Sequence, residues 1–118
     1  MSLTYKIATI NINGISSRLK IHMLRNFLMR QDIDIALLQE VTKTESPLIY
    51  GYDTHLNVGV DHRGTAIIVK ELLTLTNIKR LPTGRGIAGL FNDTRLVNFY
   101  APSGAGNRQE REHFFLTI

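Results

Sequence analysis

The sequence predicts an α/β (α+β) fold, in which a strand-helix-strand start is followed by an antiparallel meander. Before residue 40, apolar residues first alternate, then recur at helical spacing, then form a short continuous run. Beyond residue 50, short β-rich segments follow one another, separated mostly by Gly, Pro, Asn and Asp. The first pattern is typical of two parallel strands joined by a helix, and the second is typical of closely spaced antiparallel strands.

The first three elements follow from these patterns. Residues 5–12 alternate and are rich in β-branched side chains, which predicts a strand that ends at Asn13-Gly14. Apolar residues at helical spacing predict a helix over 19–31, with Ser17 as its N-cap. The almost wholly apolar run 33–38 predicts a strand that is buried on both faces.

The remainder of the chain is expected to be mostly sheet. Further strands are predicted at 52–58, 64–70, 73–81, 86–91 and 96–100. Asn92-Asp93 has the composition of a hairpin turn. Residues 101–107 are expected to form a loop, after which Asn107 and Glu110 have the spacing of a capping box that begins a last helix. The sequence stops at Ile118 within that helical pattern, which predicts a single domain, 1–118, truncated at its C-terminus.

Composition narrows the functional classes. The chain has 118 residues, of which 43% are hydrophobic and 20% are charged, as in ordinary soluble domains. No apolar run approaches the roughly 20 residues that span a bilayer, so no membrane partner is expected. The absence of cysteine excludes disulfides and thiolate metal sites. The net charge of +4 and the pI of about 9.7 permit attraction to nucleic-acid phosphates without establishing it.

Polar residues follow the first two predicted strands. Gln39-Glu40 comes directly after the run 33–38, and Asn11 and Asn13 close the first strand. In sheets that contain parallel strands, ligands tend to bind outside the carboxyl ends of the strands. Mg²⁺ takes one or two protein carboxylates and completes its shell with water and substrate oxygens. Taken alone, a glutamate after a strand is more often a solvated surface residue, so this pattern needs further support.

Four segments supply that support, because in order and spacing they resemble the endonuclease domain of LINE-type (non-LTR) retrotransposons. The segments are 9–15 (its "NxNG" segment), 37–41 ("LQE"), 64–69 ("GxAI") and 97–103 ("NxYAP"). Each motif is weak alone, but the four in register cover essentially the whole chain and about the first half of the family domain. The family belongs to the endonuclease/exonuclease/phosphatase superfamily, which includes apurinic-site endonucleases and is similar to DNase I. The resemblance implies half of a four-layer α/β sandwich of the DNase I-like fold.

The resemblance also implies roles for individual residues. Glu40 would be the ligand of a divalent cation, Mg²⁺ or Mn²⁺, and Asn11 the active-site amide beside it. Tyr100 would direct its hydroxyl at the scissile phosphate. Asn13 stands where apurinic-site endonucleases have an acidic residue and where LINE enzymes also have Asn. Ser103 replaces the Asn that many relatives have after "YAP", which leaves it as a weaker phosphate donor.

Other polar residues carry less information. Arg108 is a further weak candidate for phosphate binding, as are Arg80, Arg85 and Arg111. No pair of the four histidines has the spacing of a metal-binding helix motif, so each is expected to be structural. The family's later "GDFN" and "SDH" segments, which supply the water-orienting Asp and the phosphate-binding His, do not occur in the sequence. The chain alone is therefore expected to be inactive.

The implied activity is nicking of target DNA, which leaves a 3′ hydroxyl from which a reverse transcriptase of the same polyprotein would prime. Such a protein would act inside the cell and, when complete, in the nucleus, with DNA held through backbone contacts. One alternative is an inactive remnant that serves as a binding module. Another is an apurinic-site repair endonuclease or phosphatase of the same fold, although Asn13 argues against repair. The encoding DNA beyond codon 118 would discriminate truncation from remnant. A half-sandwich would also expose an apolar sheet face, which favours self-association.

Overall fold

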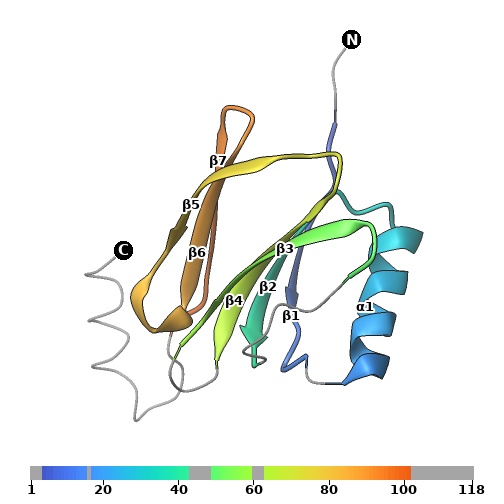
Figure 1. The fold of residues 1–118 in the computed structure, drawn as a ribbon, viewed down its shortest axis with the longest axis horizontal. Coiled ribbons are helices and arrows are strands. Elements are labelled where there is room, and N and C mark those ends of the chain that lie inside the picture. Colours follow the sequence, from blue (N-terminus) through green and yellow to red (C-terminus); the bar gives the residue numbers. More distant parts are fainter. Residues whose placement is uncertain (1–3, 16, 43–48, 60–62, 102–118) are drawn as a thin grey trace.

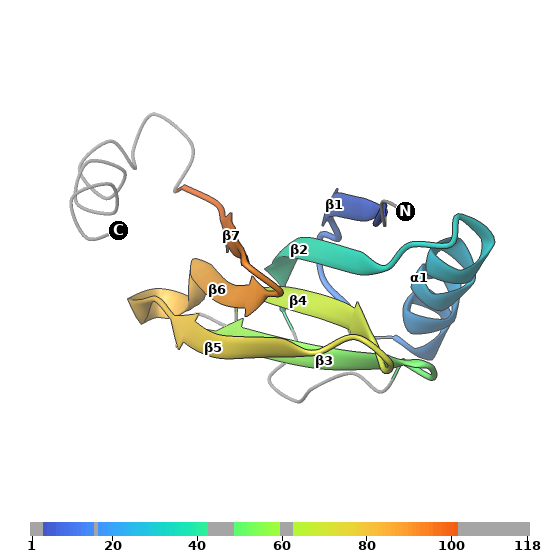
Figure 2. The same ribbon diagram turned by 90° about the horizontal axis from the view of Figure 1, so that it is seen from above.

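The computed structural model describes residues 4–15, 17–42, 49–59 and 63–101. Its elements are β1 (Ile7–Asn11), α1 (Arg18–Arg30), β2 (Ile35–Val41), β3 (Tyr52–Val58), β4 (Gly64–Lys70), β5 (Leu75–Arg80), the 3-10 turn η1 (Pro82–Gly84), β6 (Gly86–Phe91) and β7 (Thr94–Phe99). The strands form two sheets, ordered β1-β2-β4-β3 and β5-β6-β7. The sheets lie face to face, and α1 covers the outer face of the first (Figures 1 and 2). No helix in the described part is long and apolar enough to cross a membrane.

The strand-helix-strand start is confirmed. β1 and β2 are parallel neighbours, with Ile7 opposite Ile35 and Asn11 opposite Gln39. The helix between them begins as predicted, because the Ser17 side chain accepts a hydrogen bond from the backbone N–H of Lys20. Its buried residues are Leu24 and Leu28, which pack on the first sheet.

β4 shows why its sequence is a continuous apolar run. Ala66 and Ile68 belong to the core between the first sheet and α1. Ile67 and Val69 belong to the core between the two sheets. Since successive side chains of a strand point to opposite faces, a strand with a core on each side is apolar throughout.

The predicted antiparallel meander is confirmed, and the structure shows how it is divided between the two sheets. β3 and β4 pair in the first sheet, whereas β5, β6 and β7 form the second. The chain changes sheets between Lys70 and Leu75, and sequence spacing does not indicate such a crossing. The hairpin is confirmed, since Phe91 pairs with Thr94 across the two-residue turn at Asn92 and Asp93. The predicted loop and helix beyond residue 101 lie outside the described residues.

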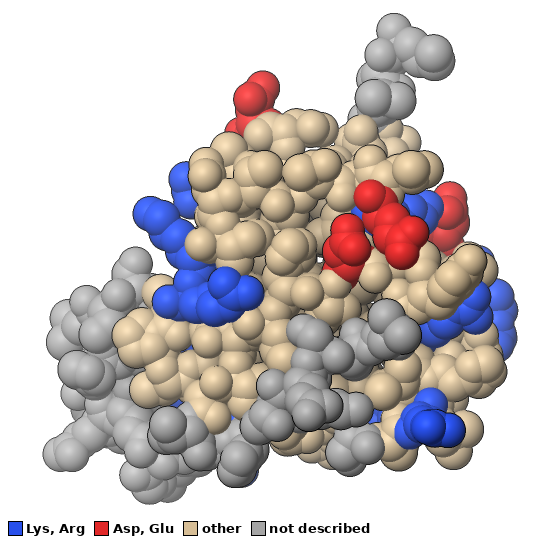
Figure 3. All heavy atoms as spheres, in the orientation of Figure 1, with Lys and Arg blue, Asp and Glu red and all other residues tan. Residues whose placement is uncertain are grey.

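Charged side chains are unevenly distributed. On the face drawn in Figure 3, most Lys and Arg side chains lie toward the left and right edges, while most acidic side chains lie in the upper right part. No single continuous basic patch covers the described residues on this face. On this face, electrostatic attraction to a nucleic acid would therefore come from scattered contacts.

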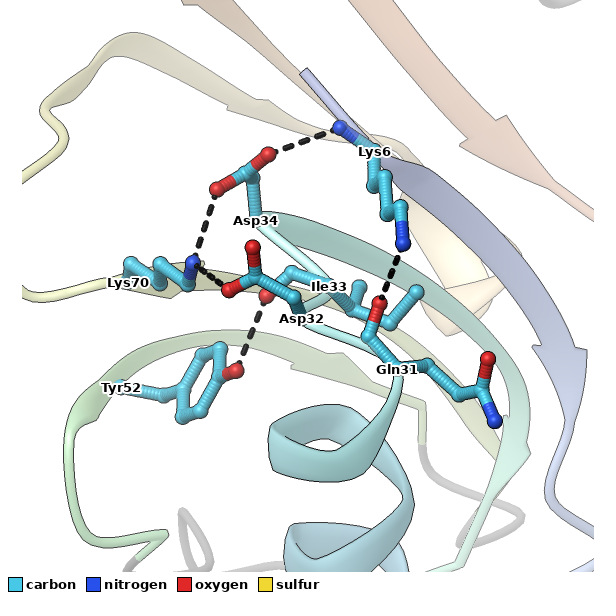
Figure 4. A network of polar contacts seen from close by, with 7 residues as sticks. All are labelled: Lys6, Gln31, Asp32, Ile33, Asp34, Tyr52 and Lys70. Atoms are coloured by element: carbon cyan, nitrogen blue, oxygen red, sulfur yellow. Dashed lines mark hydrogen bonds and ion pairs between the residues drawn. The ribbon is translucent and has the colours of Figure 1, made fainter.

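The start of β2 is held by a cluster of charges (Figure 4). The Lys70 ammonium lies 2.6 Å from the Asp32 carboxylate and 3.0 Å from that of Asp34. Burial raises the pKa of Asp34, but the backbone N–H of Lys6 and the Lys70 ammonium outweigh it and hold that pKa below its usual value. The hydrogen bonds to Asp32 and Asp34 raise the pKa of Lys70. The Tyr52 hydroxyl donates a buried hydrogen bond to the backbone carbonyl of Ile33, which lies between the two aspartates, at 2.9 Å. At this end of the sheet, the carboxylates of Asp32 and Asp34 are therefore paired with Lys70, and the buried Tyr52 hydroxyl has a hydrogen-bond partner.

Candidate active site

Glu40 lies in a β-bulge near the carboxyl end of β2. Gln39 pairs with Thr65 and Val41 pairs with Gly64, so Glu40 has no partner across the ladder. Leu38 and Val41 both belong to the core beneath α1, although regular alternation after Leu38 would place Glu40 there. The bulge therefore lifts the carboxylate out of the apolar core and leaves Glu40 half-buried.

The bulge depends on a strained backbone. Glu40 has φ 56°, a left-handed conformation that costs an L-residue about 1–2 kcal/mol. Backbone hydrogen bonds from the β1–α1 loop hold it in place. The Gly14 N–H donates to the Glu40 carbonyl at 2.7 Å, and the Ile12 N–H donates to the Gln39 carbonyl at 3.0 Å. Strain of this kind persists where its surroundings fix it, and it concentrates at functional sites.

The two predicted asparagines lie at the same end of the sheet. Asn11 is the ladder partner of Gln39, the residue before Glu40. Its side-chain oxygen accepts the Asn13 N–H at 3.1 Å, which stabilises the turn in which Asn13 adopts φ 48°. Both asparagines are exposed. The structure thus brings together three predicted site residues: Asn11, Asn13 and Glu40.

Lys20 adds a positive charge that the sequence analysis did not single out. Its ammonium donates to the Asn13 carbonyl at 2.9 Å. The signal was present in the sequence, because Lys20 lies in the first turn of a helix that follows a strand ending in the candidate site. A cation there would offset the charge of a bound phosphate.

Tyr100 comes from the other sheet. It directly follows β7, and its backbone N–H donates to the Arg85 carbonyl at 3.1 Å. The Arg85 guanidinium carbon lies 5.0 Å from the centre of its ring. Figure 1 shows the carboxyl ends of β1, β2 and β7 at the same end of the sandwich. Tyr100 and Glu40 therefore share one end of the molecule, and whether the hydroxyl faces the carboxylate remains a prediction.

A pair of hydrogen-bonded amides, the buried Asn98 and the half-buried Gln39, was also missed. Asn98, only 2% exposed, donates to the carbonyls of Leu38 and Ala66, each at 2.8 Å. Its side-chain oxygen accepts a hydrogen bond from the Gln39 amide at 2.8 Å. The available signal was a polar residue at an inward-facing position of a strand, since a buried amide requires partners.

The remaining predicted residues contribute less. Ser103 and Arg108 lie outside the described residues. His22 is exposed on α1, whereas His55 is half-buried on β3, where burial lowers its pKa. Among the described residues, no group of three or more His, Cys, Asp or Glu could hold a metal ion.

The oxygen atoms at the carboxyl ends of β1 and β2 include one clear ligand for a hard divalent cation. A half-buried carboxylate and neighbouring amide oxygens match the preference of Mg²⁺ for oxygen ligands and for few protein carboxylates. Glu40 would hold the cation, whereas the Asn11 oxygen already accepts a hydrogen bond. The described residues therefore supply one clear ligand, and further ligands would have to come from water, substrate or other residues.

Comparisons with solved structures identify the fold. The chain is similar to an AP endonuclease from Archaeoglobus fulgidus (TM-score 0.68, 24% identity, 84% of this chain and 42% of that one). It is also similar to the 3′ phosphatase NExo from Neisseria (TM-score 0.79, 19% identity, 97% of this chain and 49% of that one). A third similar structure is TDP2 from Caenorhabditis elegans (TM-score 0.67, 19% identity, 94% of this chain and 39% of that one).

These likenesses are structural, since no protein-family model matches the sequence and no curated protein matches it. The chain spans less than half the length of each of the three structures. Its two sheets and its helix correspond to part of a larger sandwich. The chain therefore has the mixed, sheet-dominated architecture of a portion of the DNase I-like fold found in these structures.

Proposed function

We propose that this chain carries the metal-binding part of a Mg²⁺-dependent DNA endonuclease of the kind encoded by LINE-type retrotransposons. One observation carries the proposal: Glu40 is held in a strained bulge beside Asn11 and Asn13, in a fold shared with DNA-processing proteins. The retrotransposon assignment rests on the four sequence motifs. In that setting the enzyme nicks target DNA, in the nucleus, to provide a primer for reverse transcription.

The residues divide the work of phosphodiester cleavage, which depends on positioning and on neutralisation of charge. Glu40 would hold the cation. A bound Mg²⁺ would supply neutralisation of the charge that develops on the phosphodiester. Tyr100 donates a hydrogen bond to a phosphate oxygen, and Lys20 and Arg85 offset the charge of the DNA backbone.

The chain alone is expected to lack activity. Within the described residues, Glu40 belongs to no group of three or more His, Cys, Asp or Glu side chains that could hold a metal ion. The sequence also lacks the "GDFN" and "SDH" segments that would supply the water-orienting Asp and the phosphate-binding His. The same observations favour a second candidate, an inactive module that binds a partner. We expect the encoding DNA to continue in frame beyond codon 118 with the "GDFN" and "SDH" segments, as the enzyme proposal requires.

Plasmid nicking tests the proposal. The 118-residue chain and the protein that includes the downstream segments are incubated with supercoiled DNA and Mg²⁺. We expect nicking by the longer protein only, and its loss on Glu40→Gln. Glu71→Gln is the matched control, because Glu71 is exposed and follows the end of β4 that lies away from Glu40.

Four results would contradict the proposal. Nicking that persists in Glu40→Gln would show that Glu40 is not the metal ligand. Robust nicking by the 118-residue chain alone would show that the Asp and His of the downstream segments are not required. A stop codon at position 119 favours the inactive module. Cleavage confined to duplexes with an apurinic site, with no nicking of intact plasmid, favours the repair alternative.

A further inference from the structure

We propose that Gln39 and Asn98 act together as a positioning pair that fixes Glu40 of the first sheet relative to Tyr100 of the second. The catalytic meaning of this inference rests on the proposed function, whereas its geometric content does not. Neither amide is proposed to contact metal or substrate. Their role is to set the separation of two residues that do.

Gln39 connects three strands through one side-chain nitrogen. Its amide nitrogen lies 2.9 Å from the Thr9 hydroxyl on β1 and 2.8 Å from the Asn98 side-chain oxygen on β7. It also lies 3.2 Å from the Leu37 carbonyl on its own strand. The two N–H groups of the Gln39 amide thus have three acceptors within hydrogen-bond distance. Thr9 and Leu37 belong to the first sheet and Asn98 to the second, so the side chain is hydrogen-bonded to both sheets.

Asn98 completes the connection from β7. Its amide nitrogen donates to the Leu38 carbonyl on β2 and to the Ala66 carbonyl on β4, each at 2.8 Å. With the bond received from Gln39, donors and acceptor are satisfied in a side chain that is 2% exposed. A satisfied buried network rigidifies the elements that it joins.

Each member of the pair lies close in sequence to one of the two site residues. Gln39 directly precedes Glu40, and Asn98 precedes Tyr100 by two residues. An extended chain advances about 3.3 Å per residue, so each site residue lies within roughly 7 Å along the backbone of one member of the pair. A hydrogen-bonded route between the two site residues therefore runs along the backbone from Glu40 to Gln39, across to Asn98, and along the backbone to Tyr100.

The apolar core between the sheets cannot replace this link. Its members, Ile35, Ile67, Val69, Leu75, Ile87, Phe91 and Leu96, hold the sheets together by burial, which is non-directional. Hydrogen bonds between amides and carbonyls require defined distances and angles. The pair therefore fixes the two sheets relative to each other next to Glu40 and Tyr100, while Asn57 and Thr65 make directional hydrogen bonds to the second sheet from other positions. A displacement of about 1 Å at a catalytic site is enough to impair it.

Asn57 provides a matched control for a purely structural role. Its amide also donates to two carbonyls across the sheets, at 2.9 Å on Leu81 and 2.7 Å on Gly86. It lies on the edge strand β3, two strands away from β2. Asn57→Leu removes a similar pair of hydrogen bonds while leaving those of Gln39 and Asn98 in place. It is a strict control, because its acceptor Gly86 is the ladder partner of Phe99, the residue before Tyr100.

The experiment measures a distance in the 118-residue chain, with Mn²⁺ as the probe. Mn²⁺ broadens NMR signals with the inverse sixth power of distance, so the broadening of the Tyr100 ring relative to the Glu40 amide reports their geometry. A displacement of about 1 Å changes this ratio roughly twofold, which matches the scale at which a site loses function. The variants are Gln39→Met, Asn98→Leu, the double variant and Asn57→Leu, each with its melting temperature.

We expect the ratio to change about twofold or more in both single variants, and the double variant to resemble either single one, because the two residues act as a unit. Asn57→Leu should lower the melting temperature and leave the ratio unchanged. A ratio that stays constant in Gln39→Met and Asn98→Leu overturns the proposal, as does an equal change in Asn57→Leu. If Asn98→Leu does not fold, the milder Gln39→Met decides.

A metal-free measurement separates this inference from the proposed function. If Mn²⁺ does not broaden Glu40 in the unmodified chain, the proposed metal ligand is wrong. The pair is then judged by the metal-free signals of the Glu40 carboxyl and the Tyr100 ring. We expect both to shift in Gln39→Met and neither to shift in Asn57→Leu, and any other pattern refutes the positioning role.

Discussion

Replacing Glu40 by glycine should stabilise the protein relative to its alanine variant while removing the metal ligand. Glu40 has φ 56° within the bulge of β2. Alanine keeps the β-carbon that makes this conformation unfavourable, whereas glycine adopts it without a steric penalty. Because both substitutions delete the carboxylate, their difference isolates the backbone strain.

The structure sets the size of the effect. A left-handed conformation costs an L-residue about 1–2 kcal/mol, and the additional chain entropy of glycine offsets roughly 0.5–1 kcal/mol of the gain. We therefore expect Glu40→Gly to exceed Glu40→Ala by about 1 kcal/mol in the free energy of unfolding. For a domain of this size, that difference corresponds to a melting temperature about 4 °C higher.

Thermal melts and Mn²⁺ titration by calorimetry measure the two consequences separately. Both variants should lose Mn²⁺ binding, although only Glu40→Gly should gain stability over Glu40→Ala. Asn92 provides the control, because it has φ 53° in the exposed hairpin between β6 and β7. Asn92→Gly should also be more stable than Asn92→Ala, with Mn²⁺ binding unchanged in both.

Two outcomes would refute this reasoning. If Glu40→Gly is no more stable than Glu40→Ala while the Asn92 pair behaves as expected, the bulge is not strained in solution. If Mn²⁺ binding survives in both Glu40 variants, the strain does not serve a metal ligand. Either result would remove the link between backbone strain and function at this position.

Three further predictions concern charge. Lys70→Met should lower the free energy of unfolding by about 1 kcal/mol at pH 7, since Asp34 would lose its ion pair with Lys70. In urea melts, the stability difference between the two proteins should shrink as the pH falls below the ordinary carboxyl pKa of 3.8. The reason is that the lowered pKa of Asp34 contributes stability above that pH, which is lost as the pH falls through the pKa of the folded state. Stability should also decline as the pH falls from 7 through 6.5, because burial lowers the pKa of His55 and the unfolded chain binds the proton more readily; His55→Gln should flatten the urea-melt profile there, and an unchanged slope would contradict this. The chain should bind random duplex DNA weakly through its net charge of +4, and its affinity, measured by fluorescence anisotropy at two salt concentrations, should fall with salt; salt-independent binding would exclude a backbone mode.

Much of the fold could be predicted because local patterns determine it. The bounds of β3, β4 and β6 were predicted as found, since Gly, Pro, Asn or Asp interrupts the sequence near their ends. The first helix and its cap at Ser17 followed from spacing and composition. The crossing from the first sheet to the second after Lys70 could not be predicted, because no local pattern says with which strand β5 pairs.

The candidate site was predictable only in part, for a related reason. Glu40 and Asn11 could be placed at one sheet end because parallel strands carry their carboxyl ends to the same edge. The bulge itself depends on pairing with Thr65 and Gly64 far along the chain. The bonds between Gln39 and Asn98 span 59 residues, so a single sequence contains no local signal for them.

The two ends of β2 illustrate how this small sheet separates stability from function. At the start of the strand, Asp34 is paired with Lys70, and Figure 4 shows these charges directed toward each other. At its other end, Glu40 is held in an unfavourable conformation and makes no salt bridge within the described residues. A strained, half-buried carboxylate lowers stability unless a bound cation or substrate compensates for it. Glycine would relieve the strain at position 40, whereas only a carboxylate there could hold a cation. The strain at Glu40, unlike the ion pair of Asp34, is therefore offset only if a ligand binds at that end of the sheet.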